Sequence, residues 1–241
     1  MGGAIDFWSG VENYTWTMEE AFPSGDSIIF DDNIKYEYSG LGAKFGMTFI
    51  PWKFLELGTV INFPITLTVT EEGTQRTDSL TDTVEVYTET SGITEEYRYS
   101  LPYTLGVGAA FRLSFLTLAA DVYWTDWRQL EYKSPDWILY ENRYIPDSYR
   151  DVISLHLGAE VTLPLNVRLR AGYFTDPIPY TVRKIENDRD YLTFGGSVLV
   201  ANQLTIDAAY NAGYFSRKDR HSEFTEAYDN QLLFLGVGYR F

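Results

Sequence analysis

Hydrophobic and polar residues alternate with a period of two along most of the chain, and this pattern predicts β-strands. The clearest example is residues 116–124 (LTLAADVYW), in which every second residue is apolar. Helical periodicity is almost absent, so we expect an all-β protein. Similar alternation predicts ten strands, at residues 4–17, 30–50, 54–70, 95–112, 115–132, 149–163, 166–176, 190–200, 204–216 and 230–241.

The second face of these strands distinguishes a membrane barrel from a soluble sandwich. It is rich in glycine and carries charges of both signs, whereas a water-facing sheet surface contains few glycines. Small residues and compensating charges suit a narrow polar lumen. We therefore predict an antiparallel up-and-down transmembrane β-barrel whose apolar face contacts lipid. The predicted lumen charge network comprises Lys44, Glu56, Arg112, Asp121, His156, Glu160, Arg168 and Asp207.

The connections between the predicted strands alternate in length. Short links alternate with long polar segments at residues 18–29, 71–94, 133–148, 177–189 and 217–229, as in barrels with periplasmic turns and extracellular loops. An even number of strands places both termini in the periplasm. We expect one domain over residues 1–241, with residues 1–20 as the first strand or a plug remnant. The start of the chain (MGG) has no signal peptide, so we expect that a targeting segment was removed.

Composition removes several function classes. The formal charge of −15 argues against nucleic acid as a partner, because phosphate contacts need clustered Lys and Arg. The absence of cysteine excludes disulfides and thiol catalysis, and two histidines leave little for a metal site. We expect no metal, no cofactor and no enzymatic activity. The mean hydropathy of −0.21 resembles that of a soluble protein, but alternating barrel strands average to such a value.

The last residues of the chain predict its location. Residues 233–241 (LFLGVGYRF) alternate apolar residues and end with Tyr239 and Phe241. This pattern matches the signal that the barrel assembly machinery reads in outer-membrane proteins. We therefore expect a monomer in the outer membrane of a Gram-negative bacterium, surrounded by lipid and lipopolysaccharide.

Two predicted hairpins resemble a known family. Residues 101–113 (LPYTLGVGAAFRL) followed by 116–127 (LTLAADVYWTDW) resemble a hairpin of the FadL/TodX outer-membrane transporters of hydrophobic compounds. Residues 157–160 (LGAE) and 169–179 (LRAGYFTDPIP) resemble the next hairpin, and 40–46 (GLGAKFG) fits one further upstream. The resemblance implies passive uptake of hydrophobic small molecules, such as long-chain fatty acids, and binding of detergent.

The chain also departs from this family. The family has fourteen strands and an N-terminal hatch with an Asn-Pro-Ala motif, and this chain has no such motif. A shortened member, an engineered reduction and a fragment are all consistent with this difference. A ten-stranded barrel is narrower than a fourteen-stranded one, because diameter grows with strand number.

Aromatic residues near the strand ends supply the candidate ligand site. Most of them are expected to form the interfacial girdle of a barrel. The alternation places four on the lumen side, where apolar walls suit a hydrophobic ligand. We predict ligand contacts from Tyr123, Trp127, Phe174 and Phe215, with Arg170 as the cation for a carboxylate head. The tyrosine-rich segment 132–150 is a candidate lid.

Two alternatives to transport remain open. The first is a structural or engineered barrel or pore that transports no hydrophobic ligand. The second is a rim protease of the omptin type, for which Asp219 and His221 in an outer loop would activate water. We also expect His156 to donate a hydrogen bond to Glu160, in preference to acting as a pH gate.

Overall fold

A computed structural model describes residues 1–23, 27–80, 87–181, 184–185, 189–201, 203–218 and 225–239. Nearly all of them belong to antiparallel strands of one sheet, so the predicted all-β class is confirmed. The strands are β1 (Gly2–Ala21), β2 (Ser27–Trp52), β3 (Leu55–Asn62), β4 (Thr66–Leu80), β5 (Tyr87–Ser100), β6 (Thr104–Arg112), β7 (Leu116–Asp126), β8 (Glu131–Ser134), β9 (Asp151–Leu163), β10 (Val167–Asp176), β11 (Lys184–Ile185), β12 (Arg189–Val200), β13 (Leu204–Lys218) and β14 (Thr225–Tyr239).

Two prolines divide two of the predicted strands. β3 and β4 both pair with β2 and are separated by residues 63–65, which contain Pro64. β6 pairs with β3, and β5 pairs with β4. Pro102 lies in the break between β5 and β6. Proline cannot donate a ladder hydrogen bond, so each pairing stops there and resumes beyond it. The predicted segments 54–70 and 95–112 are therefore each two strands.

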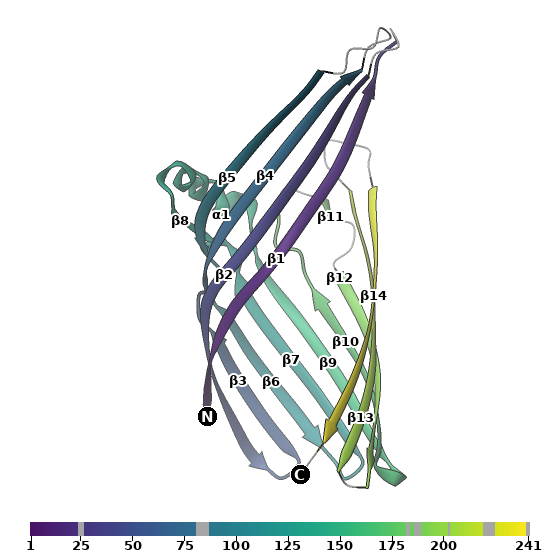
Figure 1. Cartoon of the computed structure of the whole chain (residues 1–241). Helices are drawn as coiled ribbons and strands as arrows, with labels where there is room; N and C mark the ends of the chain where they lie inside the picture. Colours follow the sequence, from purple (N-terminus) through teal and green to yellow (C-terminus); the bar gives the residue numbers. More distant parts are fainter. Residues whose placement is uncertain are drawn as a thin grey trace.

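The sheet curves around a central space but remains open (Figure 1). In the described part of the chain, β1 pairs only with β2 and β14 only with β13, so the two edge strands do not pair with each other. β1 begins and β14 ends toward the lower end of the sheet in Figure 1. Barrel closure, the strand number and the periplasmic termini stay predictions. For residues 1–20, β1 pairs with β2 along its length and forms a strand, not a plug.

Two of the predicted long loops are wrong. Most of residues 71–94 belong to β4 and β5, and residues 18–29 are mainly the ends of β1 and β2. The sequence of 71–94 is acidic and lacks a core face, but its many threonines favour extended backbone. These strands continue beyond the rest of the sheet at its upper end (Figure 1). Segment 132–150 instead contains a 3-10 helix, η2 (Asp136–Arg143), and a short helix, α1 (Ile145–Ser148).

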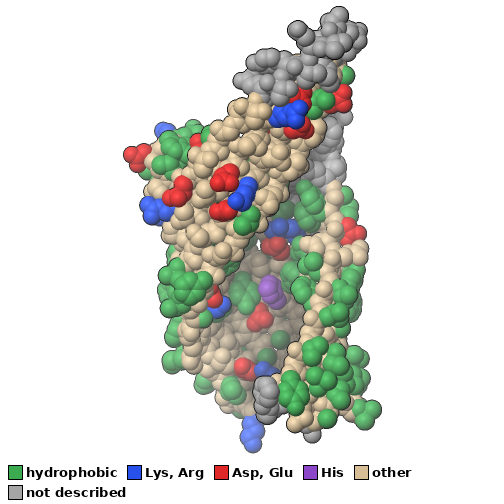
Figure 2. Space-filling view, in the orientation of Figure 1, with side chains coloured by type: hydrophobic (Ala, Val, Ile, Leu, Met, Phe, Trp, Pro, Cys, Tyr) green, Lys and Arg blue, Asp and Glu red, His purple; other side chains and the backbone are tan. Residues whose placement is uncertain are grey.

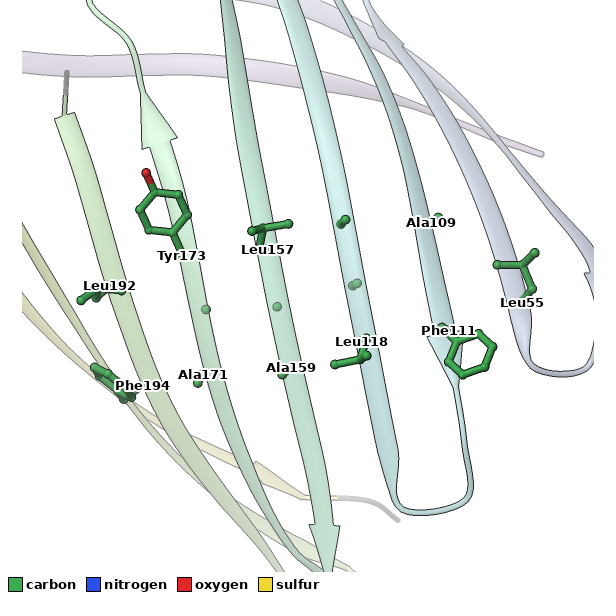
Figure 3. Close-up of a pocket in the computed structure, with 14 residues that line it drawn as sticks. Leu55, Ala109, Phe111, Leu118, Leu157, Ala159, Ala171, Tyr173, Leu192 and Phe194 are labelled. Atoms are coloured by element: carbon green, nitrogen blue, oxygen red, sulfur yellow. The ribbon is translucent and has the colours of Figure 1, made fainter.

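The outward face of the sheet is apolar, as predicted. Leu118, Leu157, Leu169 and Ile206 are between 44% and 52% exposed on this face. Rows of alanines between larger side chains leave a shallow groove of about 620 Å³, which crosses β3, β6, β7, β9, β10 and β12 (Figure 3). Within the described ranges, no helix is long and apolar enough to cross a bilayer.

The inward face lines a hollow that contains charged side chains (Figure 2). The well-buried hydrophobic side chains are few and include Leu67 and Val69 of β4, Ile138 of η2, Ile145 of α1 and Tyr191 of β12. Most of them belong to the upper elements, so the nearest equivalent of a core lies in the upper wall. This wall surrounds the site described next.

Candidate functional site

The space inside the curved sheet, which we call the lumen, contains at its upper end a cavity of about 880 Å³ whose walls are mainly aromatic. We call it the tyrosine cavity, because eight of its lining side chains are tyrosines. Elements far apart in the sequence contribute to it, from β1 to β13. Its aromatic lining consists of Tyr14, Trp16, Tyr36, Tyr38, Tyr97, Tyr99, Trp127, Tyr132, Tyr149, Tyr180 and Phe215.

Strand periodicity places the tyrosines of β2 and β5. Tyr36 and Tyr38 are two positions apart on β2, so both project inward, and Tyr97 and Tyr99 repeat the arrangement on β5. β4 lies between these strands, and its Val69 pairs with Tyr38 on one side and Tyr97 on the other. Val69 is 0% exposed, which makes it the most completely buried side chain in this wall. The tyrosine rings of β2 and β5 therefore flank a fully buried aliphatic side chain.

The charges at the cavity are already paired. The Glu12 carboxylate accepts hydrogen bonds from the hydroxyls of Tyr14 at 2.8 Å and Tyr38 at 3.0 Å. The Arg189 guanidinium lies 2.9 Å from the Asp176 carboxylate. It also lies 5.8 Å from the ring centroid of Phe215, a cation–π contact. These contacts fix the positions of the Glu12 carboxylate and the Arg189 guanidinium at the wall of the cavity.

The phenols of Tyr132 and Tyr149 are neutral at physiological pH, because the pKa of each is raised. Burial raises the pKa of Tyr132 above its ordinary value, and nearby Glu141 raises it further. Burial also raises the pKa of Tyr149, which lies against Tyr180 with ring centroids 5.0 Å apart. A neutral phenol presents an apolar ring and a hydroxyl that can donate a hydrogen bond. The cavity thus combines apolar surface with hydrogen-bond donors.

A row of rings, which we call the ring layer, lies on the inward face of the neighbouring strands β7, β9, β10 and β12, below the cavity. Phe174 stacks on Tyr191 with centroids 4.6 Å apart, and His156 lies 5.6 Å from Phe174 and 5.1 Å from Tyr123. The Tyr191 ring covers Gly213, where an added Cβ would lie 2.2 Å from ring carbons. The predicted hydrogen bond from His156 to Glu160 is wrong, because in the described structure the bonding partner of Glu160 is Arg170.

Ion pairs occupy the lumen beneath this layer. Arg170 contacts Glu160 at 2.7 Å and Asp207 at 3.5 Å, and so links β10 with its neighbour β9 and with β13. Further pairs join Arg112 with Glu56 and Lys44 with Asp6. These contacts bring together most of the predicted charge network. Three of its members, Asp121, His156 and Arg168, face the lumen without an ion pair among the described residues.

The predicted ligand residues are divided between these levels. Trp127 and Phe215 line the tyrosine cavity, whereas Phe174 and Tyr123 belong to the ring layer below it. Arg170 lies among the ion pairs and does not line the cavity. The cation at the cavity is Arg189, which sequence reasoning missed.

The missed tyrosines left a signal in the sequence. Tyr36 with Tyr38 and Tyr97 with Tyr99 are spaced two residues apart, which marks one strand face. Which face points inward depends on the register of β2 and β5 against β4. For the remaining predictions, Tyr239 ends β14, while Phe241, Asp219 and His221 lie outside the described residues.

Comparison with known proteins supports the fold. No protein-family model and no curated sequence matches the chain. Among solved structures, the monoaromatic hydrocarbon channel CymD matches with a TM-score of 0.55 and 12% identity, over 97% of this chain and 78% of CymD. The toluene transporter TodX of Pseudomonas putida matches with a TM-score of 0.55 and 14% identity. The chain shares the fold of the FadL/TodX family. The TodX match covers 98% of this chain and 69% of TodX, so the fold is present in a shorter chain.

Proposed function

We propose that the protein is a monomeric outer-membrane channel of the FadL/TodX type that takes up hydrophobic small molecules by diffusion. The observation that carries this proposal is the tyrosine cavity, an aromatic chamber of about 880 Å³ at the upper end of the lumen. Ligand sites of this size are typically apolar with a few polar groups. Long-chain fatty acids are hydrophobic molecules of this kind, and their carboxylate distinguishes them from the neutral ligands considered below.

The surface chemistry supports the location. The outward face consists of exposed leucines, isoleucines and aromatic residues, which would contact lipid tails and lipopolysaccharide. If β1 and β14 paired, the chain would form a ten-stranded barrel with both termini in the periplasm. In this count β3 with β4, and β5 with β6, each cross the membrane once, and the short strands β8 and β11 do not cross it. The tyrosine cavity would then face the outside of the cell. The barrel assembly machinery would read the C-terminal strand, which ends with Tyr239 and Phe241.

Uptake requires a route past the two levels below the cavity. The rings of Phe174 and Tyr191 and the ion pairs of Arg170 project from the inward wall there. Small residues leave space between them, since a Cβ added at Gly58 or Gly158 would meet nothing within 4 Å. We propose that the ring layer moves aside when a ligand leaves the cavity.

Uptake can be measured in vesicles whose outer leaflet contains lipopolysaccharide, because this leaflet slows hydrophobic molecules. Vesicles loaded with a cyclodextrin trap should accumulate ethylbenzene several-fold faster when they contain the protein. A variant that fills the cavity, Leu101→Trp, should lose most of this gain. The matched control Leu192→Trp on the outward face should keep it. Equal accumulation with and without protein would refute uptake.

A non-transporting barrel is the second candidate, and the ion pairs of Arg170 with Glu160 and Asp207, which tie three strands of the inward wall together, favour it. Single-channel recordings separate the two, since a scaffold conducts no ions and gives no uptake. The proposal includes no covalent chemistry. Peptide cleavage that disappears in the His221→Ala variant would instead support an omptin-like protease.

A further inference from the structure

Four tyrosine hydroxyls at the cavity have no protein partner among the described residues. Tyr14 and Tyr38 donate to Glu12, and Tyr149 interacts with Tyr180. The four remaining hydroxyls, for which the described structure contains no hydrogen bond, belong to Tyr36, Tyr97, Tyr99 and Tyr132. Their side chains are half-buried, so the hydroxyls face the cavity and can be reached by a ligand.

The rings of three of these tyrosines lie close to one another. The ring centroid of Tyr132 lies 6.3 Å from that of Tyr97 and 6.2 Å from that of Tyr99. The rings of Tyr36 and Tyr38 face the same cavity from β2, across the buried Val69 of β4. A single small molecule in the cavity would therefore meet aromatic faces and several unpaired donors together.

A hydrocarbon would leave these donors unsatisfied. A ligand that fills the cavity displaces water from the phenols, and a buried hydroxyl without an acceptor destabilises the complex. A carbonyl, ester or ether oxygen restores the lost hydrogen bond. A site lined by hydrogen-bond donors consequently discriminates against an isosteric ligand that lacks the acceptor.

The charges at the cavity disfavour a carboxylate ligand. Among the described lining residues, Arg189 is the one basic side chain, and Asp176 already holds it. Glu12 contributes a negative charge to the same wall, and Glu71 of β4 is the cross-strand partner of Tyr36 on the same inward face. An anion would thus meet two carboxylates and no free cation.

We propose that the tyrosine cavity selects neutral aromatic compounds that carry an oxygen acceptor, such as aryl ketones, esters and ethers. The proposal rests on the uptake function above and names its substrate class. Flat rings suit the stacked pairs Tyr36–Tyr38 and Tyr97–Tyr99, whose planes differ by 26° and 28°. The acceptor oxygen accepts from one or two of the phenols of Tyr97, Tyr99 and Tyr132.

Equilibrium dialysis tests this selectivity with acetophenone, ethylbenzene and benzoate. Acetophenone and ethylbenzene are nearly isosteric and differ by a carbonyl in place of a methylene. The protein is kept in amphipol, and uptake of each compound by protein-free amphipol serves as the reference. We expect acetophenone to be preferred over ethylbenzene by about tenfold relative to this reference, since each hydrogen bond contributes about threefold to tenfold. Benzoate should bind at least about tenfold more weakly than acetophenone.

Variants that remove only hydroxyls provide the decisive comparison. The triple variant Tyr97→Phe, Tyr99→Phe, Tyr132→Phe should lose most of the preference for acetophenone and keep or strengthen ethylbenzene binding. The single variants Tyr97→Phe and Tyr132→Phe test the same point with less risk to folding. Tyr214→Phe is the matched control, because Tyr214 is 59% exposed on the outward face, and it should change nothing.

The outcomes separate this proposal from the uptake function. Equal binding of acetophenone and ethylbenzene, or a preference that survives loss of the hydroxyls, overturns the selectivity but leaves uptake intact. Tighter binding of benzoate than of acetophenone also overturns it and favours fatty-acid-like ligands. Binding of none of the three compounds removes both proposals.

Discussion

An arginine at Leu157 tests the outward assignment and the depth of the membrane band together. Leu157 is the central residue of β9, six positions from both Asp151 and Leu163, and it is 44% exposed on the outward face. At about 3.3 Å per residue and a tilt of about 45°, this is about 14 Å from each strand end. The side chain thus lies near the midplane of a hydrocarbon core about 30 Å thick.

Leu157→Arg should lower the free energy of unfolding by about 2–4 kcal/mol, the cost of arginine at the midplane of a barrel. Leu163→Arg changes the same residue type on the same face of β9, but at the strand end. It should cost only about 0–1 kcal/mol because it reaches the interface. The inward control Gly158→Ala should be nearly neutral, since its Cβ would meet nothing within 4 Å.

Guanidinium unfolding in lipid vesicles, followed by tryptophan fluorescence, measures these differences. The decisive quantity is the difference between Leu157→Arg and Leu163→Arg, because it cancels effects of the substitution that do not depend on depth. Equal costs for both variants would place β9 outside a bilayer. A large cost for Gly158→Ala with tolerance of Leu157→Arg would mean that the faces are inverted.

Further predictions concern the lumen and the loops. Arg170→Met should raise the ion conductance in planar bilayers, because it removes the cation that links three strands. It should destabilise by at most about 1 kcal/mol, since the pair is solvated. Gly213→Ala should destabilise by about 1–3 kcal/mol, because the new Cβ displaces the Tyr191 ring, and denaturant midpoints measure this. The raised pKa of Tyr132 and Tyr149 should make stability fall as the pH rises above about 10, where unfolded tyrosine ionises first. Alkaline unfolding curves of the Phe variants check this.

Local alternation was sufficient to predict the strands and their two faces. Each strand carries its own period-two signal, so Leu118 and Leu157 could be assigned to the outside and Arg170 to the inside without tertiary information. The β3–β4 and β5–β6 breaks were also marked locally, by Pro64 and Pro102, although the prolines were not used as boundaries. The parts of segment 71–94 that belong to β4 and β5 were missed because the segment has no apolar face.

The site was less predictable than the fold. Which tyrosines line the cavity depends on strand register. Tyr38 and Tyr97 both lie at the level of Val69, their common partner on β4, and this places them at the same height in the wall. Arg189 follows a polar connection and shows no periodicity of its own, so nothing local marked it as the cation beside Phe215. Arg170 was predicted to lie beside Trp127 and Phe215, but the pairing of several strands places it below the cavity that these two residues line. The height of a residue along the sheet depends on how far each strand is shifted relative to its neighbours. The pattern of a single sequence does not reveal this shift.

The order of the strands in the sheet has a consequence for how the protein folds. Every described pairing joins segments that are near one another in the chain, and the most distant partners, Leu55 and Phe111, are 56 positions apart. Low sequence separation reduces the loop entropy lost when each contact forms, so each strand can add to the sheet soon after its neighbour. The register of each strand is thus specified by its neighbours. Removal of β13 and β14 would leave the pairing of β1 to β10 defined, and only a contact between the two edge strands would involve the whole chain.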